Sequence, residues 1–239
     1  MRLINTETYE LENFSDPQRI PEYAILSHTW SDKGEVCFND IIGSLCEAQG
    51  KPGWPKIQHT CTLARAINIW WAWIDTCCID KSKHSELERE INSMFDYYAN
   101  AVVCFAFLED LHPADRWNDR APKCRWFKRG WTLQELVAPR DLVFLDSSWQ
   151  ERGSKHERGA SLLDTTGVDV GVLKHRDAEE LRELLDALPV AKRMSWAAGR
   201  KTTEVEDRAY SLLGIFGITN MEVTYGRGDA FRRLVSPTL

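Results

Sequence analysis

Glu135 lies four residues after Trp131 in the stretch Arg129-Gly-Trp-Thr-Leu-Gln-Glu-Leu136, which we expect to be helical from about Trp131. Side chains four residues apart share one face of a helix, so the indole would shield the carboxyl from water. Shielding raises the pKa of a carboxyl group. Such a group can act as a nucleophile, as a general acid or base, or as the counter-charge of a sugar cation. In an ordinary solvated helix, the same spacing would give Glu135 no chemical role.

Polar side chains and tryptophans follow four segments that we expect to be strands. These strand ends are Ser27-His28-Thr29-Trp30, Asp75-Thr76-Cys77-Cys78, Leu108-Glu109-Asp110 and Asp146-Ser147-Ser148-Trp149. In open α/β sheets, ligands bind outside the carboxyl ends of the strands. A pocket for a polar molecule with an aromatic ring needs this mixture of groups. Strand ends are also polar because the chain leaves the core there, so the set indicates a site more strongly than any single residue does.

The adjacent residues Cys77 and Cys78 raise two further possibilities. Neighbouring cysteines do not form the CxxC arrangement of a zinc site, so we expect no metal. Cys77 and His28 can form a nucleophilic pair only if the thiol has a lowered pKa, which spacing does not reveal. The Walker phosphate loop, the GxGxxG motif and the HExxH motif are all absent from the sequence.

Short apolar runs alternate with helical patterns over the first 150 residues. The expected strands are residues 22–27, 70–74, 101–107 and 142–145. The expected helices are residues 57–67, 85–98 and 131–137. The run from Ala101 to Phe107 is apolar without alternation, which is typical of a parallel strand buried on both faces. Ser85 and Glu88 predict a capping box at the start of the second helix. The alternation predicts a doubly wound α/β sheet with right-handed crossovers.

The pattern changes after Trp149. Helices are expected at residues 179–188, 191–198, 205–216 and 230–235. We therefore predict a single domain over residues 1–239, with an α/β core in 1–150 and a mainly helical appendage in 151–239. Asp207 and Arg208 are expected to pair with Arg193 or Arg200 and so lock the appendage.

Composition limits the class of protein. The 239 residues include 30 Lys and Arg against 36 Asp and Glu, for a net charge of −6. This charge gives no bulk attraction to nucleic acid or to an anionic membrane. We find no apolar run long enough for a transmembrane helix and no signal peptide. Seven cysteines, several in apolar segments, indicate reduced thiols and a cytoplasmic location. Ten tryptophans indicate either a large aromatic core or rings that stack on a ligand.

Four long segments, in this order, resemble the HET (heterokaryon incompatibility) domain of filamentous fungi. They are Tyr23–Trp30, Trp73–Lys81, Arg129–Leu136, and Arg193–Arg200 with its continuation Glu206–Gly214. The resemblance covers about residues 1–235. It implies a role in non-self recognition and regulated cell death, as an effector module beside a sensing domain or partner protein.

Two of these segments are also similar to TIR domains. Tyr23–His28 is similar to the first TIR strand, and Trp131–Leu136 to the helix with the motif Trp-Cys-x-x-Glu-Leu, although Thr132 replaces the Cys. In TIR domains that cleave NAD, this glutamate is catalytic. The resemblance therefore implies a TIR-like, flavodoxin-like sheet, an NAD nucleosidase activity and Glu135 as the catalytic residue.

The same resemblance implies that NAD or a related nucleotide is the substrate and that no cofactor is required. The candidate nucleotide-binding residues are Ser27, His28, Thr29, Trp30, Asp75, Arg129 and Trp131. The indoles would stack on a base, the polar side chains would hold ribose hydroxyls or phosphates, and Arg129 would offset phosphate charge.

Two alternatives remain open at the level of sequence. The first is a non-enzymatic signalling module that acts by homotypic assembly, in which Glu135 is a surface or interface residue. The second is a hydrolase that uses Cys77 as its nucleophile.

Overall fold

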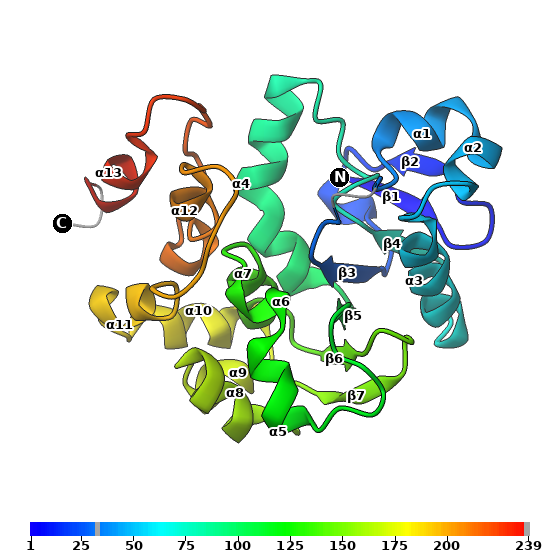
Figure 1. Ribbon diagram of the computed structural model, residues 1–239. Helices are drawn as coiled ribbons and strands as arrows, with labels where there is room; N and C mark the ends of the chain where they lie inside the picture. Colours follow the sequence, from blue (N-terminus) through cyan, green and yellow to red (C-terminus); the bar gives the residue numbers. More distant parts are fainter. Residues whose placement is uncertain (32–33, 237–239) are drawn as a thin grey trace.

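A computed structural model describes residues 1–31 and 34–236 of the chain. Its centre is a seven-stranded sheet with the order β2-β1-β4-β3-β5-β6-β7 (Figure 1). The strands are β1 Arg2–Asn5, β2 Leu11–Asn13, β3 Ala24–His28, β4 Trp71–Trp73, β5 Val103–Phe107, β6 Leu142–Leu145 and β7 Glu151–Ser154. The four strands predicted from apolar runs are β3, β4, β5 and β6, so these predictions are confirmed.

β4, β3, β5 and β6 are parallel to one another, and β1, β2 and β7 pair antiparallel with their neighbours. Taken in chain order, the parallel strands are arranged 2-1-3-4, which is the flavodoxin-like arrangement. The predicted α/β fold class is therefore confirmed. The strand order reverses between β3 and β5, where ligands of such sheets bind next to the carboxyl ends of the strands.

The apolar-run pattern did not predict the two edge strands β2 and β7, nor β1, which lies between β2 and β4. β7 consists of Glu151, Arg152, Gly153 and Ser154 and contains no large apolar residue. An edge strand pairs on one side only and often carries charged side chains, so it lacks the apolar signal of a central strand.

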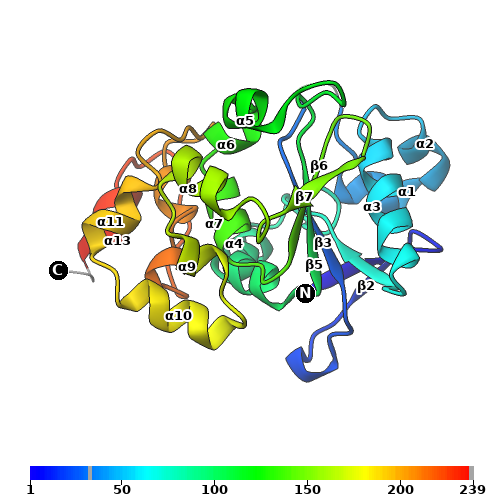
Figure 2. The ribbon, with the colours of Figure 1, turned by 90° about the horizontal axis from the view of Figure 1, so that it is seen from below.

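Helices cover both faces of the sheet. They are α1 Phe38–Gly43, α2 Leu45–Gln49, α3 Trp54–Ala66, α4 His84–Asn100, α5 Trp117–Arg120, α6 Arg125–Lys128, α7 Thr132–Val137, α8 Gly159–Thr166, α9 Val170–Leu173, α10 Ala178–Asp186, α11 Val190–Ser195, α12 Asp207–Tyr210 and α13 Ala230–Val235. Short 3₁₀ helices span Pro17–Arg19, Ala121–Lys123 and Gly214–Phe216. Figure 2 shows α1 to α3 on one face, α4 and α7 on the other, and α10 to α13 outside α4 and α7.

The core accounts for many of the tryptophans. Trp73 and Trp126 are fully buried, and Trp126 packs edge-on against Phe144 with ring centroids 5.7 Å apart. The candidate ligand-binding rings Trp30 and Trp131 are only partly buried. The large aromatic core is thus confirmed, and it leaves these two rings accessible for other contacts.

Two local predictions were wrong. α4 begins at His84 after an N-cap at Lys83 that makes no side-chain cap, so Ser85 and Glu88 form no capping box. Arg193 pairs with Asp186 (Nη1–Oδ1 3.8 Å) instead of Asp207. The partners of Asp207 and Arg200 belong to the candidate site.

Candidate functional site

Glu135 lies on α7 and is buried against the carboxyl end of β3. Its carboxyl accepts a hydrogen bond from the hydroxyl of Ser27, which in turn accepts one from the indole N–H of Trp126 (Nε1–Oγ 2.8 Å). Only 6% of the surface of Glu135 is exposed. The structure therefore brings two of the predicted site residues together, at the point where the strand order reverses.

Burial raises the pKa of Glu135 to about 8, because water no longer solvates the charged form. The hydrogen bond from Ser27 and the positive charge of Arg129 act in the opposite direction, whereas the negative charge of Asp75 raises the pKa further. Glu135 is consequently protonated in most molecules at neutral pH. Burial thus raises the pKa of this carboxyl, in the direction expected from the sequence.

Asp75, directly after β4, connects two residues from the end of β3. Its carboxylate accepts hydrogen bonds from His28 (Nε2–Oδ1 3.0 Å) and from the indole of Trp30 (Nε1–Oδ2 2.8 Å). Burial raises the pKa of Asp75, but the hydrogen bond from His28 and the charge of Lys81 outweigh it and hold the pKa well below its usual range. Asp75 is therefore ionised, whereas Glu135 is neutral.

His28 has one ring nitrogen that contacts no partner. Nε2 binds Asp75, and Nδ1 is buried without a hydrogen-bond partner among the residues that the structure describes. Buried polar atoms are normally hydrogen-bonded, so an unpaired one at a strand end indicates a position that a ligand or water fills. The structure thus places His28 as the sequence predicted, beside Asp75.

Two cations lie over the ring of Trp30. The ammonium of Lys81 is 3.5 Å from the ring centroid, and the guanidinium carbon of Arg129 is 5.6 Å from it. Cations are attracted to the electron-rich face of an indole. Trp30 thus already binds positive charge, and Arg129 lies beside it as the sequence predicted. Thr29 is buried, and its carbonyl accepts a hydrogen bond from Lys56 (3.1 Å).

Helical spacing predicted that Trp131 would shield Glu135, but its indole N–H binds Asp207. Its indole N–H donates to Asp207 of α12 (Nε1–Oδ2 3.0 Å), so its polar edge is directed toward the C-terminal helices. Asp207 therefore pairs with neither Arg193 nor Arg200, and the predicted lock was wrong. The indole connected to Glu135 is that of Trp126, through Ser27.

Sequence reasoning missed Arg200 as a part of the site. Its guanidinium donates from Nη1 to the carbonyl of Arg129 and to the hydroxyl of Thr132, both at 3.0 Å. Burial lowers the pKa of Arg200 to about 10, and the ionised form of Glu135 opposes that effect. The C-terminal part of the chain therefore supplies a buried cation next to the glutamate. In the sequence, Arg200 ends the segment 193–200, whose arginines were expected to lock the helical appendage.

Gly130 lets the loop before α7 approach the segment around Thr202 closely. A Cβ at this position would lie 2.5 Å from Cγ2 of Thr202. We expect Gly130→Ala to lower the free energy of unfolding by about 1–3 kcal/mol, because the added methyl group has no space. Chemical denaturation measures this change.

A second substitution tests the cause. Thr202→Ser removes only Cγ2 and keeps the hydroxyl that donates to the carbonyl of Glu204 (2.6 Å). The double variant should regain most of the lost stability. A Gly130→Ala protein as stable as the wild type would show that this contact is not tight.

The alternative nucleophile Cys77 does not join this site. Cys77 is fully buried, and the neighbouring Cys78 together with burial raises its pKa, the opposite of what a nucleophile needs. Over residues 1–31 and 34–236, no cluster of three His, Cys, Asp or Glu side chains is placed to hold a metal. In the same residues, no helix has the length and apolarity needed to cross a membrane.

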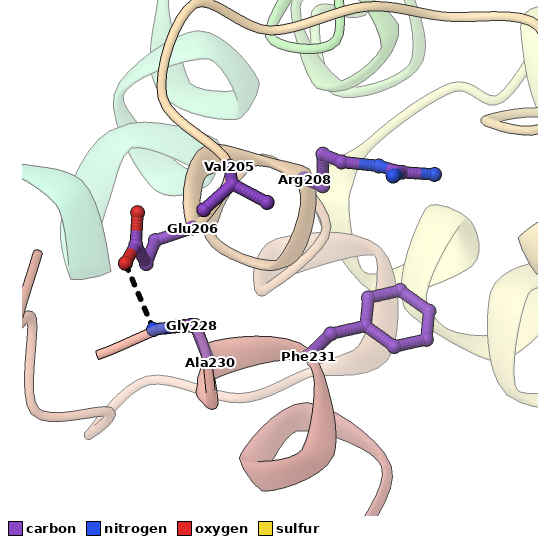
Figure 3. Close-up of a pocket in the computed structure, with 6 residues that line it drawn as sticks. All are labelled: Val205, Glu206, Arg208, Gly228, Ala230 and Phe231. Atoms are coloured by element: carbon purple, nitrogen blue, oxygen red, sulfur yellow. Dashed lines mark hydrogen bonds between the residues drawn. The ribbon is translucent and has the colours of Figure 1, made fainter. Parts of the chain in front are cut away.

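A cavity of about 240 Å³ lies between α12 and α13 (Figure 3). Its wall includes Glu206, whose carboxylate accepts a hydrogen bond from the backbone N–H of Gly228 (3.1 Å) and closes the loop before α13. None of the predicted site residues lines this cavity. We therefore assign Glu206 a structural role.

The fold and these contacts define a flavodoxin-like α/β domain with a buried glutamate at the topological switch point and a helical part that adds to the site. Comparison with known proteins gives the family. The family model for heterokaryon incompatibility protein (HET) matches residues 23–115. The vegetative incompatibility protein HET-E-1 of Podospora anserina is 38% identical over 218 residues, which cover 88% of this chain. The chain belongs to the HET family.

The chain spans about 15% of the length of HET-E-1. No solved structure matches the chain. The resemblance to the HET domain is thus confirmed, whereas the activity has to be argued from the site itself.

Proposed function

We propose that this HET domain cleaves the bond between nicotinamide and ribose in NAD with Glu135, and that the reaction serves heterokaryon incompatibility and regulated cell death. The observation that carries the proposal is the hydrogen bond between Ser27 and Glu135. It holds a perturbed carboxyl at the carboxyl end of β3, where flavodoxin-like sheets bind nucleotides.

The proposed reaction breaks the bond between the anomeric carbon of the ribose and the pyridinium nitrogen. Nicotinamide leaves as a neutral molecule with the bonding electrons, and the ribose becomes an oxocarbenium-like cation. Water then adds to the anomeric carbon and releases a proton, so the products are nicotinamide, ADP-ribose and H⁺. A carboxylate placed beside the ribose stabilises the positive charge of this transition state.

The perturbed pKa of Glu135 is compatible with this role. The carboxyl is neutral while the site is empty, which avoids a buried charge. NAD brings a positively charged pyridinium ring, and a nearby positive charge favours the ionised form of a carboxyl group. Substrate binding would therefore generate the carboxylate that the reaction needs.

Trp30 offers a binding face for the nicotinamide ring. The ammonium of Lys81 lies over this indole at 3.5 Å from the ring centroid. The pyridinium ring is itself a cation, so it can replace Lys81 on the same face with similar energetics. The unpaired Nδ1 of His28, held by Asp75, is available for a ribose hydroxyl.

The test is direct. Concentrated, assembled protein is incubated with NAD, and nicotinamide and ADP-ribose are separated by chromatography. We expect equimolar release of both products. If folded and assembled protein releases no nicotinamide, the NAD-cleaving function is rejected.

The non-enzymatic assembly module is the alternative outcome of that experiment. In that alternative, Glu135 lies on the surface or in an interface. Only 6% of the surface of this residue is exposed. Its burial supports a role inside a site. A module without NAD cleavage that still assembles would have to use other residues.

A further inference from the structure

A shallow cleft of about 300 Å³ opens beside the candidate site. Five cationic side chains line it: Lys123, Arg125, Lys128, Arg129 and Lys201. Threonine hydroxyls complete its wall, among them that of Thr202. The protein as a whole has a net charge of −6, so this cleft is a local concentration of positive charge on an acidic molecule.

Two distant parts of the chain build the cleft. The backbone N–H of Lys201 donates to the carbonyl of Lys128, and the N–H of Gly130 donates to the carbonyl of Lys201, both at 2.7 Å. The loop between α6 and α7 and the segment that follows α11 therefore run side by side as a short parallel bridge. Because this bridge is made of backbone bonds, it holds the backbones of Lys128 and Lys201 next to each other.

The charge in the cleft is largely uncompensated. Within the part of the chain that the structure describes, no ion pair or side-chain hydrogen bond engages Lys123, Lys128 or Lys201. The guanidinium of Arg125 pairs only distantly with the carboxylate of Glu109 (Nη1–Oε2 3.9 Å). Clustered like charges repel each other, and a bound anion removes that repulsion.

The cleft adjoins Glu135 from two directions. Thr29, in its wall, is two residues beyond Ser27, which binds the carboxyl of Glu135. Arg129, also in its wall, lies three residues before the start of α7 and over the ring of Trp30. A ligand with a sugar at Glu135 would therefore extend its next group into the cleft.

We propose that this cleft binds the pyrophosphate of the dinucleotide, with Lys128 from the core and Lys201 from the C-terminal part both contacting it. The inference rests on the proposed function and adds to it a second binding site. Lysine ammonium groups act as point charges for phosphate oxygens, and arginine adds paired hydrogen bonds. The C-terminal part then supplies one side of a phosphate site whose other side comes from the α/β core.

Binding measurements test this without any cleavage. Isothermal titration calorimetry is carried out at low salt with ADP-ribose, with inorganic pyrophosphate and with adenosine, which lacks phosphate. We expect the variant Lys128→Ala/Lys201→Ala to bind ADP-ribose and pyrophosphate at least 10-fold more weakly than the wild type, with a shallower dependence on salt. Adenosine affinity should not change.

The matched control is Lys174→Ala/Lys192→Ala, which removes the same charge from the C-cap of α9 and from α11, outside the cleft. It should bind both phosphate probes as the wild type does. Equal affinity of the wild type and the Lys128→Ala/Lys201→Ala variant for ADP-ribose would overturn the proposal. Loss of pyrophosphate binding with ADP-ribose binding unchanged would also overturn it, because the cleft would then hold only free phosphate.

The outcomes separate this inference from the proposed function. If the wild type binds ADP-ribose through the two lysines but releases no nicotinamide from NAD, the cleft is a nucleotide site and the enzymatic proposal fails. If NAD is cleaved and the two lysines are irrelevant to ADP-ribose binding and to KM, the enzymatic proposal stands and the cleft proposal fails.

Discussion

Glu135→Gln is expected to lower the rate of NAD cleavage at least about 100-fold, which is the usual cost of losing one electrostatic contact to a transition state. Glutamine keeps the size of the side chain and accepts the hydrogen bond from Ser27, but it carries no charge at any pH. It therefore leaves the oxocarbenium-like ribose without a counter-charge. Nicotinamide release, followed by chromatography over several enzyme concentrations, measures the effect.

The matched control is Glu90→Gln. Glu90 is also a buried glutamate, 2% exposed on α4, and it pairs with Arg89 (2.9 Å) instead of facing a strand end. A folded Glu90→Gln protein should cleave NAD at the wild-type rate. A folded Glu135→Gln protein with undiminished turnover would assign the chemistry to another residue.

The site holds its two carboxyls in opposite states. Asp75 is ionised because His28, Trp30 and the charge of Lys81 favour its charged form, whereas Glu135 is neutral because burial disfavours its charge. Separated pKa values of this kind let two similar groups take different roles. In the proposed reaction, Asp75 fixes the orientation of His28 and Trp30 permanently, and Glu135 gains its charge only when NAD is bound.

The sequence predicted the residues at the strand ends because parallel strands have a clear pattern. β3 and β5 are buried on both faces, so they read as continuous apolar runs whose last polar residues mark the ligand side. Ser27, Asp75 and Glu135 could therefore be assigned to one region before any coordinates. The resemblance to TIR domains added the role of Glu135, which spacing alone left open.

The remaining parts of the site depend on tertiary packing. Helical spacing places Trp131 and Glu135 on one face, but it does not fix the direction in which each side chain points. The indole is directed to Asp207, and the place beside Ser27 belongs to Trp126. Arg200 is 65 residues after Glu135 in the chain, and only the backbone bridge between Arg129 and Lys201 brings it close.

The second large effect concerns stability and follows from the same buried carboxyl. The pKa of Glu135 is raised from 4.5 to about 8 in the folded protein by burial. Between these two values the folded state holds a proton that the unfolded state has released. The free energy of unfolding therefore falls as pH rises through this range, by about 1.4 kcal/mol for each pH unit at most.

Glu135→Gln removes this dependence, because glutamine does not titrate. Close to pH 5 the variant and the wild type should have similar stability. By pH 8 the variant should be more stable by about 3 kcal/mol. Urea unfolding at pH 5, 6, 7 and 8 measures the difference between the two proteins, and a difference that does not change with pH would contradict the burial of an ionisable carboxyl.

Asp75→Asn provides the opposite case. The pKa of Asp75 is held well below 3.8 by its hydrogen bond from His28 and the charge of Lys81, which together outweigh burial. Its contribution is therefore complete above pH 4 and constant from pH 5 to pH 8. Asp75→Asn should be less stable than the wild type by the same amount at every pH in this range, whereas the advantage of Glu135→Gln over the wild type grows with rising pH. The proposed catalytic carboxyl would thus cost stability at neutral pH, whereas the carboxylate proposed to position His28 and Trp30 would contribute to it, as expected where function and stability compete.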